Sequence, residues 1–289
     1  MRLDDEREST NFEIQDGRGG LGGGLGGGLG LLLPLIGSRF GCGGIVVVLI
    51  IMAVMGVNPL SLMGGGGQMP QGSEVSRDSS RLSDVQHWSL KVLGSTERVW
   101  GSLFQQAGQQ YQPTVLSFYS QNGSSGCGAA QSAMGPFYCP NDRKVYLDTD
   151  FFTELRQRFG APGDFAQAYV IAHEVGHHVQ DLEGTLGEVN QKQRAVSEAQ
   201  GNALQVRVEL QADCYAGVWA KRTGLMEPGD LEEGMKAAQA IGDDTLQKAA
   251  GRRPVPESFT HGTSEQRMTW LRKGLDSGDP AQCDTFKGA

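Results

Sequence analysis

The stretch AYVIAHEVGHHVQDLEG, residues 168–184, contains three of the five histidines of the chain. His173 and His177 are four residues apart, so a helix places both imidazoles on one face. Glu174 is rotated from them by one residue and can hold a water molecule beside a bound ion without ligating that ion. This His-Glu-x-x-His pattern predicts a zinc site with its own general base. A polar helix face can carry the same residues, so the hypothesis needs a third ligand.

Three nearby side chains are candidates for that third ligand. Glu183 lies six residues after His177, a spacing that requires a glycine turn which the sequence lacks. His178 is rotated by about 100° from His177, so the two cannot readily face one ion. Glu209, in VELQADCYAG, lies on the next predicted helix and is the favoured ligand.

A second acid accompanies the favoured ligand. Asp213 follows Glu209 by one helical turn and shares its face. Such a pair fits a ligand and an acid that accepts the N–H of a ligating histidine, here His173. Two solvated acids on a helix are the alternative, which the upstream His-Glu-x-x-His pattern weakens.

The first 84 residues differ from the rest of the chain. Residues 1–38 include the repeat LGGGLGGGLG and predict a cytoplasmic low-complexity segment. Residues 39–60 contain an uncharged, largely aliphatic run and predict a transmembrane helix; a cleaved signal peptide and a buried strand are the rival interpretations. Arg39 precedes this run and places the N-terminus in the cytoplasm. Residues 61–84 predict a flexible linker, so the expected protein is single-pass, with residues 85–289 as a periplasmic or extracellular domain.

The apolar pattern of that domain predicts an α+β class, mostly helical with a small sheet. Strands are expected at PTVLSFYS and KVYLDTDFF. The motif helix is expected to begin at Asp164 as N-cap. KQRAVSEAQGNALQVRVELQADCYAGVWAKRTG predicts one long helix that ends near Gly224. Two further helices are expected from about Asp230 and Ser264.

The cysteines suggest the redox environment of the domain. Cys42 lies in the predicted span, whereas Cys127, Cys139, Cys214 and Cys283 lie in the domain. Four thiols in an exported domain suit two disulfides, for which three pairings exist. Cys127–Cys139 is favoured because it closes a short loop, and Cys214–Cys283 then remains. Four buried free thiols are the alternative.

The bulk composition narrows the class of partner. The chain has 289 residues and a formal net charge of −8. A nucleic-acid-binding protein is expected to show a basic footprint, so this balance argues against that class. The expected partners are a peptide or protein substrate and a membrane.

The motifs together resemble a known family. HEVGH followed by ELQAD resembles the gluzincin metallopeptidases. With NFE, CGAAQSAMGPFYCPNDRKVYLD, AHEVGHHVQ, ELQADCYAGVW and FTHGTSEQR, nearly the whole chain resembles the bacterial, membrane-anchored family described as "putative neutral zinc metallopeptidase". The resemblance implies a zincin-like domain with His173, His177 and Glu209 as zinc ligands, Glu174 as the base and Asp213 as partner of His173. It supplies no substrate, and the Leu-Gly repeat departs from it.

These residues would perform peptide-bond hydrolysis. Three protein ligands leave one zinc position for water, which is typical of a catalytic site. Glu174 would carry the proton of that water to the leaving amine, and His261 would donate a hydrogen bond to the oxyanion. KVYLD is expected to be the edge strand that binds substrate. A non-proteolytic zinc-containing module of the cell envelope is the alternative, against which Glu174 argues, and a zinc hydrolase of non-peptide bonds stays open.

Overall fold

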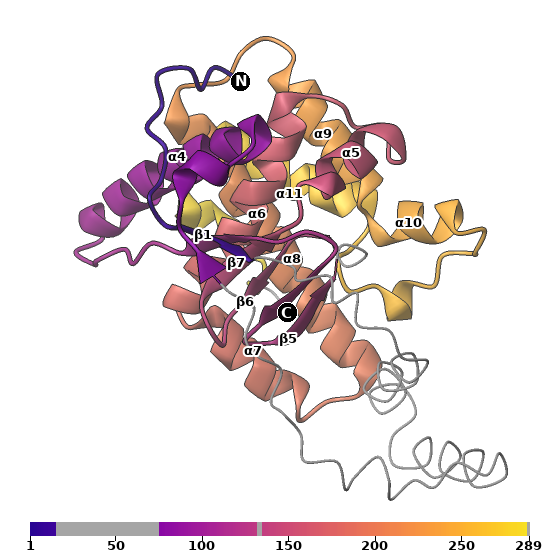
Figure 1. Ribbon diagram of the computed structural model, residues 1–289. Coiled ribbons are helices and arrows are strands. Elements are labelled where there is room, and N and C mark those ends of the chain that lie inside the picture. The colour runs from indigo at the N-terminus through magenta and orange to yellow at the C-terminus, as the bar shows by residue number, and fades with distance from the viewer. Residues whose placement is uncertain (16–74, 132–134, 288–289) are drawn as a thin grey trace, which may run out of the picture. The chain divides into compact units, whose positions relative to one another are not determined.

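The fold is that of a computed structural model, which describes residues 1–15, 75–131 and 135–287. The described strands come before residue 150, and helices make up most of the described chain after it (Figure 1), so the predicted α+β class is confirmed. The helices are α4 (Asp84–Gln106), α5 (Asp150–Gln157), α6 (Asp164–Leu182), α7 (Thr185–Gln193), α8 (Glu198–Thr223), α9 (Asp230–Ala240), α10 (Asp243–Ala249) and α11 (Ser264–Ser277). Short 3-10 turns lie at Ser79–Arg81, Pro256–Ser258 and Pro280–Cys283.

A five-stranded sheet has the order β2-β1-β3-β7-β6. Its strands are β1 (Phe12–Gln15), β2 (Val75–Ser76), β3 (Val115–Phe118), β6 (Phe137–Cys139) and β7 (Lys144–Leu147). The three middle strands are parallel, and each outer strand is antiparallel to its neighbour. A separate hairpin is formed by β4 (Asn122–Ser125) and β5 (Gly128–Gln131).

The order of the strands corrects one expectation. KVYLD corresponds to β7, which lies between β3 and β6 and is therefore an inner strand. Within the described sheet, β6 is the edge strand on the side of the motif helix. Among the described strands, β6 pairs with β7 alone, antiparallel, as in the pair Cys139 and Lys144. Strands of only two to four residues do not reveal this order in the sequence.

Residues 1–15 belong to the folded domain. In β1, Phe12 pairs in parallel with Leu116 of β3, and the Met1 amino group lies 2.9 Å from Asp164 and 3.0 Å from Asp230. These residues and 75–287 form one compact unit. The expectation that residues 1–38 form a low-complexity segment apart from the domain is therefore wrong for residues 1–15.

The predicted linker and membrane span have different outcomes. The end of the expected linker 61–84 is folded, because β2 pairs with β1 and Ser83 caps α4. The predicted span at residues 39–60 lies outside the described residues. Across the part of the chain that the structure describes, no helix combines the length and apolar character needed to cross a bilayer. A single crossing between β1 and β2 would separate strands that are paired here, so the single-pass arrangement and this sheet cannot both hold.

Helix boundaries follow local capping, with two corrections. The N-cap of α6 is Gly163, with a φ of 120°, and not Asp164, whose carboxylate binds the Met1 amino group. The expected long helix is two helices, because Ser197 begins α8 with a reciprocal capping box to Gln200. The predicted end of α8 is confirmed, since Gly224 adopts a left-handed conformation there.

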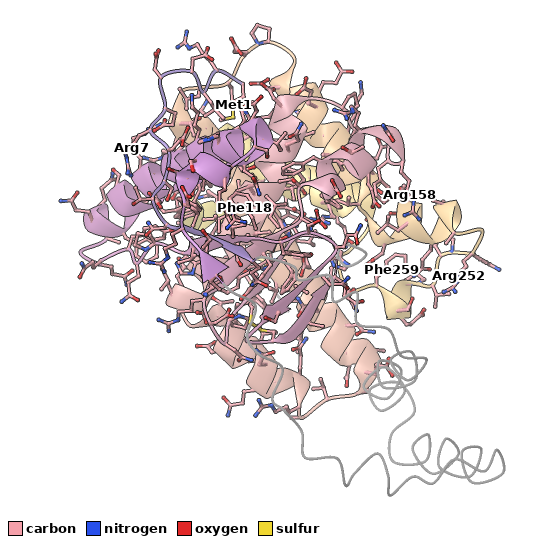
Figure 2. The ribbon with its side chains drawn as sticks, in the orientation of Figure 1. Met1, Arg7, Phe118, Arg158, Arg252 and Phe259 are labelled. Carbon is pink, nitrogen blue, oxygen red and sulfur yellow. A yellow bond between two sulfur atoms is a disulfide. The ribbon has the colours of Figure 1, made fainter. Side chains whose placement is uncertain are left out.

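Close helix packing positions the site. A side chain on Gly217 of α8 would collide with the backbone of α11, and one on Gly274 of α11 would collide with the Cys214 carbonyl. Both glycines therefore let α8 and α11 approach closely. Phe118, at the end of β3, is fully buried at the centre of the molecule (Figure 2), where the sheet packs on the helices.

Two disulfides stabilise this arrangement. Cys127 of the hairpin turn is bonded to Cys139 of β6, and Cys214 of α8 is bonded to Cys283 near the C-terminus. Both predicted pairings are present. The first connects the hairpin to the edge strand, and the second holds the C-terminal segment against the helix that carries Glu209.

Candidate metal centre

Helix α6 places two histidines on its inner face. His173 is 5% exposed, and the ring centroids of His173 and His177 are 4.8 Å apart. The packing of α6 on α8 is close, because Gly176 of α6 faces Ala212 of α8. This approach brings both imidazoles to the side chains of the second helix.

Glu209 of α8 completes a group of three ligand atoms. Its Oε2 atom lies 3.2 Å from Nε2 of His173 and 3.5 Å from Nε2 of His177. Ligand atoms about 2.0–2.1 Å from a tetrahedral zinc are separated by roughly 3.3–3.4 Å, which these distances match. The structure thus brings together the three predicted ligands in a geometry that fits zinc.

Hydrogen bonds at the Nδ1 atom of each imidazole explain why the Nε2 atoms face Glu209. The Nδ1–H group of His173 donates to Asp213 at 2.8 Å, and that of His177 donates to Gln180 at 2.9 Å. Each Nε2 atom then presents a lone pair toward Glu209. Convergence of two lone pairs and a carboxylate requires a cation among them, either a metal ion or added protons.

The other two candidates for the third ligand lie elsewhere. Glu183 accepts a hydrogen bond from Tyr215 at 2.7 Å. His178 is 1% exposed, and its ring nitrogens face the Tyr138 hydroxyl and the Gln112 carbonyl. Neither side chain belongs to the metal-capable group around His173.

Asp213 is the centre of a buried polar network. Besides His173, it accepts a hydrogen bond from the Tyr169 hydroxyl at 2.6 Å and two from Arg267 at 2.8 and 2.9 Å. Burial alone would raise the pKa of Asp213, but Arg267 and His173 outweigh it and lower the pKa to about 2. Asp213 therefore stays ionised, as an acceptor for the ligating imidazole requires.

Two glutamines support the other ligands, and the sequence analysis missed both. Gln180 holds His177, and its amide nitrogen donates at 2.8 Å to the Val208 carbonyl of α8. Gln205 donates at 2.9 Å to Oε1 of Glu209, which leaves Oε2 facing the histidines. Their positions, three residues after His177 and four before Glu209, were the available signal.

The charges of the site favour a bound cation. Without a metal, burial would lower the pKa of His173, but Asp213 and Glu209 outweigh it and raise the pKa to about 9. Burial likewise opposes ionisation of Glu209, but His177 and His173 lower the pKa of Glu209 well below its ordinary value. A metal ion that binds here at neutral pH must therefore displace a proton.

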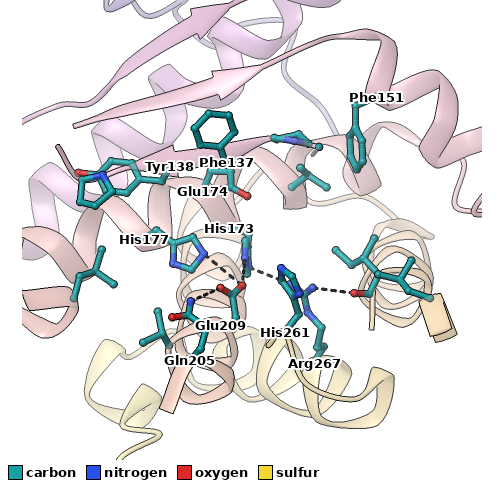
Figure 3. A pocket seen from close by; sticks show the side chains of 18 of the residues that line it. Phe137, Tyr138, Phe151, His173, Glu174, His177, Gln205, Glu209, His261 and Arg267 are labelled. Atoms are coloured by element: carbon teal, nitrogen blue, oxygen red, sulfur yellow. Dashed lines mark hydrogen bonds and ion pairs between the residues drawn. The ribbon is translucent and has the colours of Figure 1, made fainter. Parts of the chain in front are cut away.

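Glu174 is placed differently from the ligands. It is 7% exposed and lines the cleft above the metal group (Figure 3). Among the described residues, no group donates a hydrogen bond to its carboxylate. Burial raises the pKa of Glu174, an effect that His173 and His177 partly offset. A desolvated, unpartnered carboxylate in such a position is suited to accept a proton.

His261 lies in the loop before α11 and also lines the cleft (Figure 3). Its Nδ1 atom lies 3.3 Å from Oδ1 of Asp243, and its backbone N–H donates to Oδ2 of Asp243 at 2.6 Å. Burial would lower the pKa of His261, but the Asp243 hydrogen bond and the Glu209 charge raise it. When its ring is protonated, His261 carries an N–H on Nε2 as well.

The geometry brings two histidines of a His-Glu-x-x-His motif and a glutamate of a second helix into one group that could hold a metal ion. The profile of the family described as "putative neutral zinc metallopeptidase" matches residues 1–286, and the chain belongs to this family. The resemblance expected from the motifs is thereby confirmed.

Relatives extend over most of the chain. It is 46% identical over 291 residues to the uncharacterized protein YpfJ of Escherichia coli strain K12, with 99% of both chains covered. It is 43% identical over 227 residues, 73% of both chains, to the uncharacterized protein Rv2575 of Mycobacterium tuberculosis strain H37Rv. No solved structure matches the chain.

Proposed function

We propose that this protein is a zinc-dependent peptidase in which Glu174 is the general base. The observation that carries the proposal is the free carboxylate of Glu174 beside the converging His173, His177 and Glu209 atoms. A purely structural zinc site would need no such carboxylate, so this placement argues against a module that holds zinc for stability alone.

The residues of the chain have separate tasks. Zinc held by His173, His177 and Glu209 would polarise the substrate carbonyl and acidify a water molecule. Glu174 accepts the proton of the attacking water and delivers it to the leaving nitrogen. His261, with a proton on Nε2, donates a hydrogen bond to the oxygen that becomes negative.

A peptide is the substrate class that the surroundings favour. Phe137 and Tyr138 of β6 line the cleft beside Glu174, and β6 is an edge strand. An edge strand can hold an extended peptide through backbone hydrogen bonds, and the cleft would then receive its side chains. β6 takes the role that the sequence analysis gave to KVYLD.

We further propose that the folded domain lies outside the cytoplasm. The two disulfides support this, because such bonds persist in oxidising compartments. Since β1 is part of the same unit, residues 1–15 would lie there as well.

The test uses the purified full chain, its zinc content and cleavage of a quenched peptide library. Glu174→Gln should keep zinc and lose activity by about 100-fold or more, because the amide cannot accept a proton. Glu209→Ala should lose most of the zinc. Glu188→Gln, an exposed glutamate on α7, is the matched control and should behave as wild type.

Three results would count against the proposal. Equal cleavage by wild type and Glu174→Gln would show that Glu174 is not the general base. Full zinc retention by Glu209→Ala would reopen Glu183 and His178 as ligands. A zinc-loaded wild type that cleaves no peptide of the library would overturn the peptidase activity.

His261 has its own test. His261→Ala should lower kcat with little change in zinc content, because the imidazole does not belong to the metal group. His87→Ala is the control, since His87 lies on α4 and pairs with Glu8. Unchanged kcat in His261→Ala would leave the oxyanion donor unassigned.

A further inference from the structure

The cleft extends well beyond the metal ligands. It has a volume of about 650 Å³ and is lined by residues of β6, α5, α6, α7, α8 and α10 and by the loop of His261. Many of the lining residues lie outside the group of His173, Glu174, His177 and Glu209. The part of the cleft that they line is available to substrate side chains.

The cleft has two ends along α6. Val170 precedes Glu174 by about one helical turn, whereas His177 follows it by nearly one turn. Figure 1 shows α5 and α10 to the right of α6 and α7 below it. In Figure 3, Phe151 of α5 and Tyr138 of β6 lie at opposite ends, with Glu174 between them.

The end formed with α5 and α10 offers the larger apolar surface. We define the α5–α10 end by Phe151, Phe159, Val170, Ile241 and Leu246. All of these except Val170 are half-buried, so a bound side chain would remove further apolar surface from water.

Two charged residues also lie at this end of the cleft. Glu154 and Arg158 line it as well, and the Arg158 guanidinium lies 5.4 Å from the centroid of the Phe159 ring. The methylene stem of such an arginine adds apolar area while its head group stays in water. Arg158 is exposed, as a rim position requires.

The end formed with α7 has less to gain. Tyr138, Val189 and Val208 line it but are already 9%, 3% and 1% exposed. Asn190 and Gln205 add polar side chains at this end, and the half-buried Leu186 of α7 also lines it. A large apolar side chain would gain less burial there than at the α5–α10 end.

We propose that the α5–α10 end is the main specificity pocket and binds a large aliphatic or aromatic side chain of an extended peptide. The inference rests on the proposed peptidase function. One helical turn, about 5.4 Å, separates Val170 from Glu174 along α6. An extended peptide advances about 3.3 Å per residue, so the selected side chain lies within two residues of the scissile bond.

The experiment measures cleavage and binding separately on the zinc-loaded full chain. Peptides that differ only in Phe, Leu, Ala, Lys or Asp at one position near the scissile bond are compared by kcat/KM, with cleavage sites mapped by mass spectrometry. Phe and Leu should exceed Ala, Lys and Asp by about tenfold or more at one position, the usual range for apolar pockets. Binding of the Phe and Ala peptides to Glu174→Gln is measured in parallel by fluorescence anisotropy.

Variants of Leu246 connect this preference to the pocket. Leu246→Asp should reduce kcat/KM for the Phe peptide by about tenfold or more, and for the Ala peptide much less. Leu246→Ala, which carries less risk to folding, should do the same to a smaller extent. Leu231→Asp is the matched control, because Leu231 is 38% exposed on α9 and does not line the cleft.

The two readouts separate the possible failures. Cleavage without preference for Phe or Leu would contradict the specificity pocket but not the peptidase function. A preference that Leu246→Asp leaves unchanged would have the same meaning. Tighter binding of the Phe peptide that depends on Leu246, without any cleavage, would support the specificity pocket and contradict the peptidase function. Equal binding of both peptides with no cleavage overturns the pocket as well.

Discussion

The Nδ1 atom of His173 lies 2.8 Å from Oδ1 of Asp213, and both side chains are buried. The contact fixes which imidazole nitrogen faces Glu209. It also connects the metal group to Arg267 and Tyr169, which hold Asp213 from its other sides.

Asp213 and Glu174 should respond differently to removal of their charge. Asp213→Asn should weaken zinc binding by roughly 10–100-fold, because its effect passes through the orientation of His173. Its activity should recover substantially in excess zinc, whereas Glu174→Gln should not recover at any zinc concentration. Zinc titrations with activity read at saturation test this. An Asp213→Asn variant that stays inactive at saturation, beside an active Glu174→Gln variant, would reverse the two roles.

Arg267 should be essential to stability although it binds no metal. It is 2% exposed and forms two hydrogen bonds with Asp213. Arg267→Leu leaves a buried carboxylate without its cation, which costs about 3–5 kcal/mol. Thermal unfolding should therefore shift by roughly 6–20 °C in a domain of this size. Arg272→Leu, at an exposed position on the same helix, should leave the melting temperature nearly unchanged. Equal shifts of the melting temperature in the two variants would contradict the structural role of Arg267.

Zinc affinity should increase with pH. The pKa of His173 is raised to about 9 by Asp213 and Glu209 against the effect of burial, and zinc requires the neutral imidazole. Protons therefore compete with zinc below that pKa, and the competition strengthens as the pH falls. Between pH 8 and pH 6 the apparent affinity should fall about 100-fold for one displaced proton. Competition with a chelating indicator measures it, and Asp213→Asn should show a weaker dependence. An affinity that is constant over this range would contradict the charge state assigned to His173.

Residues 1–15 and the rest of the domain should lie on the same side of any membrane. Asp5→Cys and Glu265→Cys, both at exposed positions, can be compared in a Cys42→Ser background. A membrane-impermeant maleimide should label both in intact cells if the domain is exported. Opposite accessibility would mean that β1 does not pair with β3 in the cell. Protection of both until lysis would overturn export.

Much of the site was predictable because its signals are local. The spacing of His173 and His177 fixes a shared helix face, and the interval between Glu209 and Asp213 does the same on α8. Capping residues such as Ser197 also act over a few positions. The predicted long helix ran through Ser197, although the capping box there marks the start of a separate helix. Gln180 and Gln205 lie at helical spacing from their partners. Glutamine is so common on helices, however, that this spacing alone does not identify a residue that supports a metal ligand.

The sequence by itself determined the candidate metal-binding motif and the helices that carry it, because periodicity, capping and ligand spacing depend on neighbours along the chain. Only the tertiary structure decided that Phe12 lies beside Leu116, that β6 is the edge strand and that Arg267 reaches Asp213. These contacts join residues far apart in the sequence. They arise from burial of apolar surface and close helix packing, which are collective properties of the folded chain and leave no periodic signal in any one segment.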